Sequence, residues 1–219
     1  MGILNLSPDS FYDGEKNITH SFLEEKLKQN IYSDIIDIGA ESSRPFSNPV
    51  SVKDEIERLS VFVDMKKNTD KILSIDSYKY DVIKYALDNG FHIINDISGG
   101  GDRNCNMGLA ADYNVPIVIM HMQGTPKTMQ VKPKYKNLID DMLNFFEIKI
   151  KSMKDDFNLS NNQIIIDPGI GFGKSQEDNY SIIDNICKFK KFGFPVLLGL
   201  SRKSFLSIDD DQPKDRKMA

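Results

Sequence analysis

The chain has 219 residues and a formal net charge of −4, with 40% hydrophobic, 27% charged and 10% aromatic residues. This length suffices for a sizeable core, and the near-average composition excludes disordered and collagen-like proteins. The weak negative charge argues against nucleic-acid binding, and no apolar run approaches the roughly 20 residues that a membrane helix needs.

Short β-branched runs alternate with longer charged, amphipathic runs along the chain. The short runs are typical of strands buried on both faces, and they cover residues 2–6, 34–38, 72–75, 92–95, 116–120, 163–166 and 195–198. The longer runs predict helices over residues 18–32, 52–68, 80–89, 106–113, 137–157 and 178–192. Ser51 with Asp54 resembles a capping box, and Gly90 and Gly193 stand where helices usually end. The alternation predicts an α/β protein with a parallel sheet.

Seven such strands fit either a (β/α)₈ TIM barrel or an open, doubly wound sheet. Polar residues favour the barrel, because nearly every predicted strand ends in one: Asn5, Asp37, Asp76, Asn95, His121, Asp167 and Ser201. In a barrel these ends converge on one rim, whereas in an open sheet only those at a switch point meet. Because a barrel usually takes about 250 residues, we expect one barrel domain over residues 1–219 that lacks its final strand and helix.

Asp76, Asn95 and Asp167 are the strongest candidate site residues. A buried carboxylate needs a partner, and two carboxylates with an amide suit a flat ligand edge that carries several N–H groups. An internal hydrogen-bond network is the alternative interpretation. Residues 201–203, Ser-Arg-Lys, suit an anion or a ligand carbonyl, and the alternatives are a solvated helix start or a Schiff-base role for Lys203.

Two loops resemble anion sites. Residues 167–175 contain three glycines, but Pro168 stands where a Walker motif needs Gly, and Lys174 stands where a dinucleotide fingerprint needs it. We interpret this loop as a tight strand-to-helix connection that lets the backbone approach a ligand. Residues 41–45 form a second polar loop in which Arg44 can hold phosphate oxygens, unless it is an ordinary turn.

Seven segments together resemble the dihydropteroate synthase family, in the family's order and over nearly the whole chain. They are residues 1–11 (MGILNLSPDSF), 37–45 (DIGAESSRP), 74–77 (SIDS), 94–98 (INDIS), 120–126 (MHMQGTP), 167–174 (DPGIGFGK) and 200–205 (LSRKSF). The resemblance implies a pterin-binding barrel of folate biosynthesis. Such an enzyme condenses 6-hydroxymethyl-7,8-dihydropterin pyrophosphate with p-aminobenzoate, in an SN1-like course that gives 7,8-dihydropteroate and pyrophosphate.

The resemblance also implies roles for individual residues. The pterin pocket comprises Asp76, Asn95, Ile97, Met120, Asp167, Phe172 and Lys203. The catalytic residues are Asp76, Asp167, Lys203 and Arg44. The pyrophosphate contacts Asn5, Ser43 and Arg44, and Asn5 also binds the cofactor Mg²⁺. The p-aminobenzoate pocket comprises Phe11, Ser43, Arg44, Pro45 and Ser204.

The implied partners are the two small-molecule substrates, sulfonamides as inhibitors, a second copy in a homodimer and a fused pyrophosphokinase domain. Residues 1–8 lack the basic flank of a secretory signal, and the two cysteines fit a reducing compartment, so we expect a cytoplasmic protein.

The chain departs from the family pattern at two places. The family's Thr and Gly around the Arg-Pro pair are Ser43 and Phe46 here, and no Arg-x-His motif follows Arg202. A pterin-dependent methyltransferase, an aldolase-type enzyme and a non-catalytic pterin-binding module are the competing functions.

Overall fold

The computed structural model describes residues 1–6, 18–42, 49–65, 69–125, 128–129, 133–201 and 203–206. Six strands form one sheet in chain order: β1 (Gly2–Asn5), β2 (Ile35–Gly39), β3 (Ile72–Asp76), β4 (Ile93–Asp96), β5 (Ile117–Met120) and β6 (Ile164–Asp167). Every neighbouring pair runs parallel. The predicted α/β class is therefore confirmed.

The helices follow the strands in the predicted alternation. They are α1 (His20–Gln29), α2 (Val52–Met65), α3 (Tyr80–Asp88), α4 (Cys105–Asp112), α5 (Leu138–Asp155), α6 (Gln176–Asp184) and α7 (Ile186–Lys190). Short 3₁₀ turns lie at η3 (Asp102–Asn104), η4 (Asn161–Gln163) and η5 (Ser204–Leu206). None of the described helices is both long enough and apolar enough to pass through a membrane.

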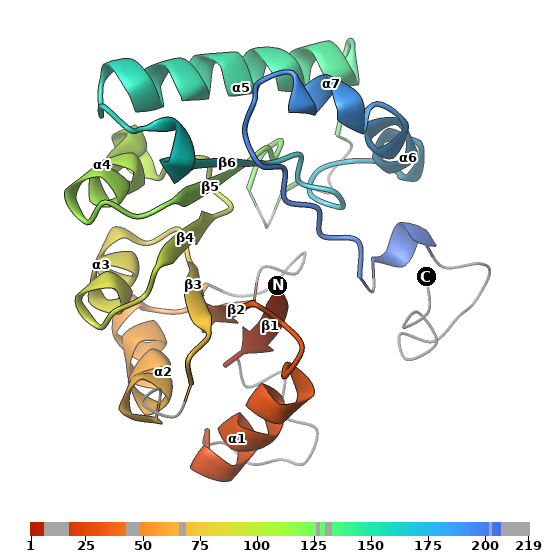
Figure 1. The fold of residues 1–219 in the computed structure, drawn as a ribbon. Coiled ribbons are helices and arrows are strands. Elements are labelled where there is room, and N and C mark those ends of the chain that lie inside the picture. The colour runs from red at the N-terminus through yellow and green to blue at the C-terminus, as the bar shows by residue number, and fades with distance from the viewer. Residues whose placement is uncertain are drawn as a thin grey trace.

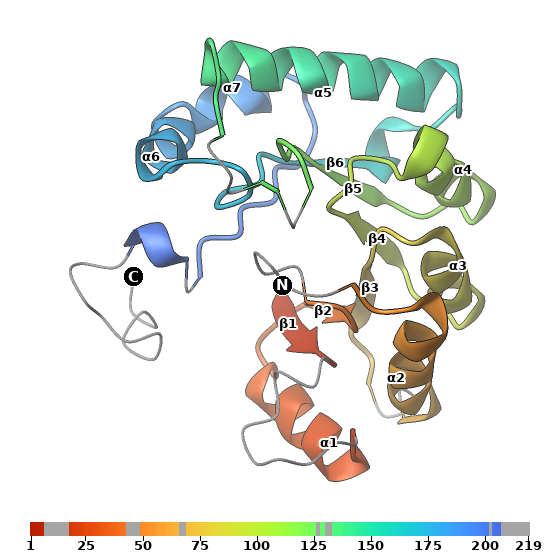
Figure 2. The same cartoon turned by 180° about the vertical axis from the view of Figure 1, so that it is seen from behind.

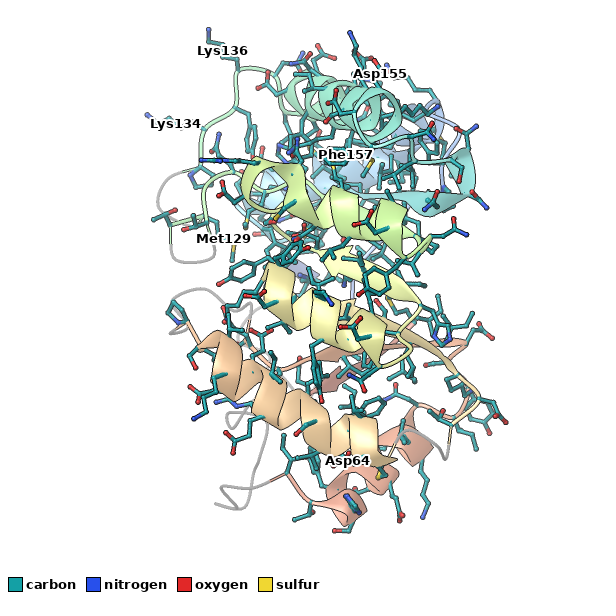
Figure 3. The ribbon with its side chains drawn as sticks, turned by 90° about the vertical axis from the view of Figure 1, so that its left-hand side faces the viewer. Asp64, Met129, Lys134, Lys136, Asp155 and Phe157 are labelled. Atoms are coloured by element: carbon teal, nitrogen blue, oxygen red, sulfur yellow. The ribbon has the colours of Figure 1, made fainter. Side chains whose placement is uncertain are left out.

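The sheet curves, and the helices lie along its outer side (Figure 1 and Figure 2). Figure 3 looks onto this outer layer, where α2, α3 and α4 lie side by side with α5 beyond α4. Phe157, labelled there, follows α5 and brings its ring to α4, where a Cβ on Gly108 would lie 3.7 Å from it. The core lies between this layer and the sheet, and Phe62 of α2, Phe146 of α5 and Phe189 of α7 are fully buried in it.

Local signals in the sequence explain where several helices begin and end. The Ser51 hydroxyl accepts a hydrogen bond from the amide of Asp54 at 3.1 Å, as predicted. Gly90 and Gly193 both have φ of 77°, which allows the chain to leave the preceding helix. At α6, the Ser175 hydroxyl accepts from the amide of Asp178, whose carboxylate in turn accepts from the amide of Ser175.

Two predictions about the last third of the chain are wrong. The helix predicted over residues 178–192 is divided into α6 and α7, because Asn185 leaves the helical conformation with φ of −104° and ψ of 15°. Its side-chain amide donates to the carbonyl of Ser181 at 2.9 Å, which closes α6.

The seventh predicted strand, over residues 195–198, is a single bridge. Val196 pairs in parallel with Ile166, and Leu197 N–H donates to the Ile166 carbonyl at 2.9 Å. Pro195 has no N–H to extend the ladder. The segment lies beside β6, as a seventh barrel strand would, but the described residues contain six strands rather than seven.

Candidate active site

The parallel register gathers the predicted site residues at the carboxyl ends of the strands. Asp76 at the end of β3 pairs with Asn95 of β4, and Met120 at the end of β5 pairs with Asp167 of β6. Asp76, Asn95 and Asp167 each keep part of their surface exposed, whereas the strand residues before them are mostly buried. We call Asp76, Asn95 and Asp167 the strand-end cluster. Its polar groups are accessible to a ligand at the rim where parallel α/β folds bind their substrates.

Gly39 brings Asn5 toward this cluster. It ends β2 and pairs with Asn5 on one side and with Asp76 on the other. A Cβ on Gly39 would lie 3.1 Å from a carboxylate oxygen of Asp76 and 3.5 Å from the side-chain oxygen of Asn5. Because glycine leaves this space open, the two side chains lie on either side of it.

Asp37 is a further polar residue of the site. The sequence predicted that it lies at a strand end but indicated no role for it. The side-chain amide of Asn95 donates to one carboxylate oxygen of Asp37 at 2.8 Å. Within the part of the chain that the structure describes, the other oxygen is buried without a hydrogen-bond partner. Burial raises the pKa of Asp37, and the nearby hydroxyl of Ser74 and the bond from Asn95 oppose that rise. This bond fixes the orientation of the Asn95 side-chain amide, and Asp37 thereby also sets where the side-chain oxygen of Asn95 points.

Asp76 lies in a strongly acidic environment. Burial raises the pKa of Asp76 well above its usual value, and the nearby carboxylates of Asp37, Glu55, Asp96 and Glu41 raise it further. Because these carboxylates lie close together, the surroundings of Asp76 are electrostatically negative. The site therefore favours a ligand that donates N–H groups or that develops positive charge during reaction.

The loop after β6 lines the site on the side away from β2 and β3. The amide of Gly169 donates to the Asp167 carboxylate at 2.7 Å. Burial raises the pKa of Asp167 to about 6, although this bond and the charges of Lys203 and Lys174 lower it. The Lys203 ammonium lies 4.4 Å from the centre of the Phe172 ring, a cation–π contact. Burial lowers the pKa of Lys203, whereas Asp167 and Asp76 raise it.

The remaining predicted residues are placed as follows. Ile97 and Met120 are buried next to the cluster, at the ends of β4 and β5, where they can form an apolar wall. Asn5 is exposed at the end of β1. Phe11, Ser43, Arg44, Pro45 and Arg202, as well as the side chain of Ser204, lie outside the described residues.

A buried ionic network joins the end of β2 to α2 and α3. The Lys79 ammonium pairs with the carboxylates of Glu41 and Glu55, the latter at 2.7 Å, and donates to the carbonyl of Val50. The amide of Val50 donates to Glu41 at 3.0 Å, so Glu41 and Val50 are held together. Burial alone lowers the pKa of Lys79, but the hydrogen bonds that its ammonium donates to Glu41 and Glu55 outweigh burial and raise the pKa.

His121, a candidate ligand contact, is buried. Its ring packs edge-on against Phe145 at 5.1 Å and near Tyr135 at 6.0 Å, and its Nδ1 has no hydrogen-bond partner among the described residues. Burial lowers its pKa to about 3, with a further contribution from Lys174. The ring is therefore neutral at physiological pH and supports the wall through packing.

Comparison with known proteins shows the family of this chain. A family described as pterin binding enzyme matches residues 1–219. A dihydropteroate synthase of Synechocystis is 38% identical over 221 aligned residues, which cover 99% of this chain and 76% of the relative. The chain belongs to the dihydropteroate synthase family.

Solved structures of dihydropteroate synthases extend this agreement to the fold. The Yersinia pestis enzyme in a sulfonamide drug complex superposes with a TM-score of 0.89 at 34% identity, covering 98% of this chain and 79% of that one. The Xanthomonas albilineans enzyme with 4-aminobenzoic acid gives 0.85 at 31% identity, covering 98% and 78%. These dihydropteroate synthases are TIM barrels, so the curved sheet in Figure 1 is the corresponding part of such a barrel.

Proposed function

We propose that this dihydropteroate synthase binds the pterin of its substrate through the strand-end cluster. The supporting observation is that Asp76, Asn95 and Asp167 are partly exposed at the carboxyl ends of β3, β4 and β6, with Phe172 and Lys203 after β6. The carboxylates accept hydrogen bonds from the N–H groups of the pterin edge, and Asn95 offers its amide oxygen. Ile97, Met120 and Phe172 cover the ring.

The acidic surroundings of Asp76 suit the reaction that the family carries out. When pyrophosphate leaves 6-hydroxymethyl-7,8-dihydropterin pyrophosphate, the bond between the methylene carbon and the pyrophosphate oxygen breaks. Both electrons of that bond stay on the oxygen, and positive charge develops on the methylene carbon. In their ionised form, which a nearby positive charge favours, Asp76 and Asp167 stabilise that charge electrostatically, and Lys203 orients the ring. The neutral amine of p-aminobenzoate then attacks the methylene carbon and loses a proton. Dihydropteroate and pyrophosphate are the products.

The pyrophosphate and amine sites complete the proposal. Asn5, Ser43 and Arg44 bind the pyrophosphate, and Phe11, Ser43, Arg44, Pro45 and Ser204 surround p-aminobenzoate. The described residues contain no group of three or more His, Cys, Asp or Glu that could hold a metal ion. Mg²⁺ often uses few protein oxygens together with substrate phosphates. The amide oxygen of Asn5, next to the site, fits this role, and the ion when bound neutralises charge on the leaving pyrophosphate.

The proposed setting is a cytoplasmic homodimer whose native polypeptide also carries a pyrophosphokinase domain. Free Cys105 and Cys187 agree with a reducing compartment. Sedimentation of the chain is expected to give twice its mass of 24.9 kDa, and a monomer would exclude the dimer. Fractionation of the source cells, with the mass of the native polypeptide, tests the compartment and the fusion.

The experiment that tests the function is formation of dihydropteroate from labelled p-aminobenzoate. We expect Asp76→Asn to lower turnover by about 100-fold, because it removes a charge that stabilises the cationic carbon. The matched control is Asp112→Asn, which changes an exposed carboxylate at the end of α4, before β5 begins. Unfolding of both variants by denaturant checks that the fold is kept. Equal turnover in the two variants would refute the role of Asp76.

A further inference from the structure

Lys174 is buried in the loop after β6, although lysine side chains usually reach solvent. Its side chain is 3% exposed. The ammonium donates to three backbone carbonyls, of His121 at 3.0 Å, Gly169 at 2.9 Å and Phe172 at 2.9 Å. All three of its N–H donors are therefore used by the backbone. Among the residues that the structure describes, no carboxylate forms an ion pair with it.

These three bonds hold together the loop after β5 and the loop after β6, which line the proposed pterin site. His121 directly follows β5, and its amide donates to the carbonyl of Asp167 at 2.9 Å. Gly169 directs its amide to the Asp167 carboxylate, and Phe172 supplies the ring beneath Lys203. One ammonium thus joins the backbone of the residue that follows Met120 to both segments of the β6 loop.

The backbone around Lys174 is folded tightly, and it depends on glycine. Gly169 has φ of 67°, and a Cβ there would lie 2.1 Å from the carbonyl oxygen of His121, a contact that side chains do not make. The amide of Phe172 also donates to the Gly169 carbonyl at 3.0 Å. The carbonyls therefore converge on one point, which would be unfavourable without a hydrogen-bond donor between them.

We infer that Lys174 is a positioning residue for pterin binding, because it fixes the backbone that orients the Asp167 carboxylate and the Phe172 ring. This inference rests on the proposed function. Lys174 does not touch the pterin, since its donors are all occupied by carbonyls. Its effect on the ligand passes through Gly169 and Phe172.

The test is a calorimetric titration of 6-hydroxymethylpterin into the full chain and into Lys174→Met. The Met side chain has a similar length but no donors, so the three carbonyls lose their shared partner. We expect the pterin Kd to rise about tenfold, the equivalent of roughly one hydrogen bond to a charged group. Steady-state assays are expected to show a higher KM for the pterin substrate and an unchanged KM for p-aminobenzoate. A purely structural role would reduce the active fraction and leave both constants unchanged.

Two further variants complete the test. Lys174→Gln keeps two N–H donors without the charge, so its Kd should lie between those of the parent and the Met variant. It also keeps the test valid if the Met variant does not fold. Lys149→Met is the control, because Lys149 is a partly buried lysine outside the loop after β6. Its ammonium donates to the side-chain oxygen of Asn104 at 2.8 Å. Its Kd should equal the parent's.

The outcomes separate the inference from the function on which it rests. Parent-like pterin affinity in both Lys174 variants would overturn the positioning role while the proposed function stands. Failure of the parent chain to bind the pterin would overturn the proposed function and the inference together.

Discussion

Two lysines, the partly buried Lys79 and the buried Lys174, support opposite sides of the site in different ways. Lys79, beside β2 and β3, neutralises the carboxylates of Glu41 and Glu55, whereas Lys174, beside β5 and β6, is surrounded by backbone carbonyls. Their pKa values move in opposite directions. Hydrogen bonds donated to the two glutamates raise the pKa of Lys79 despite its partial burial, and burial lowers the pKa of Lys174 to about 7.

The contrast indicates different tasks for the two lysines. Lys79 compensates charge, because Glu55 is only 1% exposed and would otherwise be a buried, unpaired anion. Lys174 compensates no single carboxylate, and it shapes the backbone next to Asp167 and Phe172. Loss of Lys79 should therefore affect folding most strongly, and loss of Lys174 should affect the pterin site most strongly.

The largest expected effect is on stability. Lys79→Met should lower the free energy of unfolding by about 3–5 kcal/mol, because it leaves Glu55 buried without its partner. Denaturant unfolding measures this loss. The control is Lys84→Met, which removes an exposed pair with Asp88 on α3 and should change the free energy of unfolding far less. Similar losses in both variants would show that Lys79 is not a charge-compensating residue.

A smaller effect concerns the pH dependence of stability. The native pKa of Lys174, about 7, lies below its ordinary value of 10.5, so the unfolded chain binds this proton more tightly between those pH values. The contribution of Lys174 to the free energy of unfolding should therefore rise by about 1–2 kcal/mol from pH 7 to pH 9. Denaturant unfolding at both pH values should show a larger increase in the parent than in Lys174→Met. Parallel changes would contradict the assignment.

Lys79 is a useful contrast because its pKa shift has the opposite direction. Its native pKa is raised, so its contribution is fully present below the ordinary pKa of 10.5 and is lost only as the pH rises above that value. Stability that depends on Lys79 should therefore stay constant between pH 7 and pH 9.

The third prediction concerns pterin affinity at acidic pH. Asp167 has a native pKa of about 6, so its carboxylate is ionised above that pH and accepts pterin N–H groups best there. Affinity for 6-hydroxymethylpterin should fall by up to about tenfold per pH unit below pH 6. Calorimetry from pH 5 to pH 7 measures this. Asp167→Asn should lose most of the dependence, and an unchanged pH profile in that variant would assign the titration to another group.

Much of the fold could be predicted because its signals are local. β-branched runs located the six strands, and Ser51, Gly90 and Gly193 marked helix ends correctly. Residues 195–198 have the same apolar composition as the strands, but a strand needs a continuous ladder with its neighbour, and composition does not reveal that only Val196 forms a bridge. The break at Asn185 has a local signal, since asparagine is a poor residue for a helix interior.

The site was harder to predict, because its geometry depends on distant contacts. Polar strand ends indicated Asp76, Asn95 and Asp167, and parallel register brought Asp76 and Asn95 together. The bond from Asn95 to Asp37 joins residues 58 positions apart, and the bond from Lys174 to His121 spans 53. The sequence indicated a tight glycine-rich turn around Lys174, but not that its ammonium would be enclosed by it.

An experimental structure of the chain with 6-hydroxymethylpterin bound tests the role of the strand-end cluster most directly. We expect pterin N–H groups about 3 Å from carboxylate oxygens of Asp76 and Asp167, with the ring against Phe172. A pterin bound away from the strand-end cluster, or one whose N–H edge faces solvent, would contradict it.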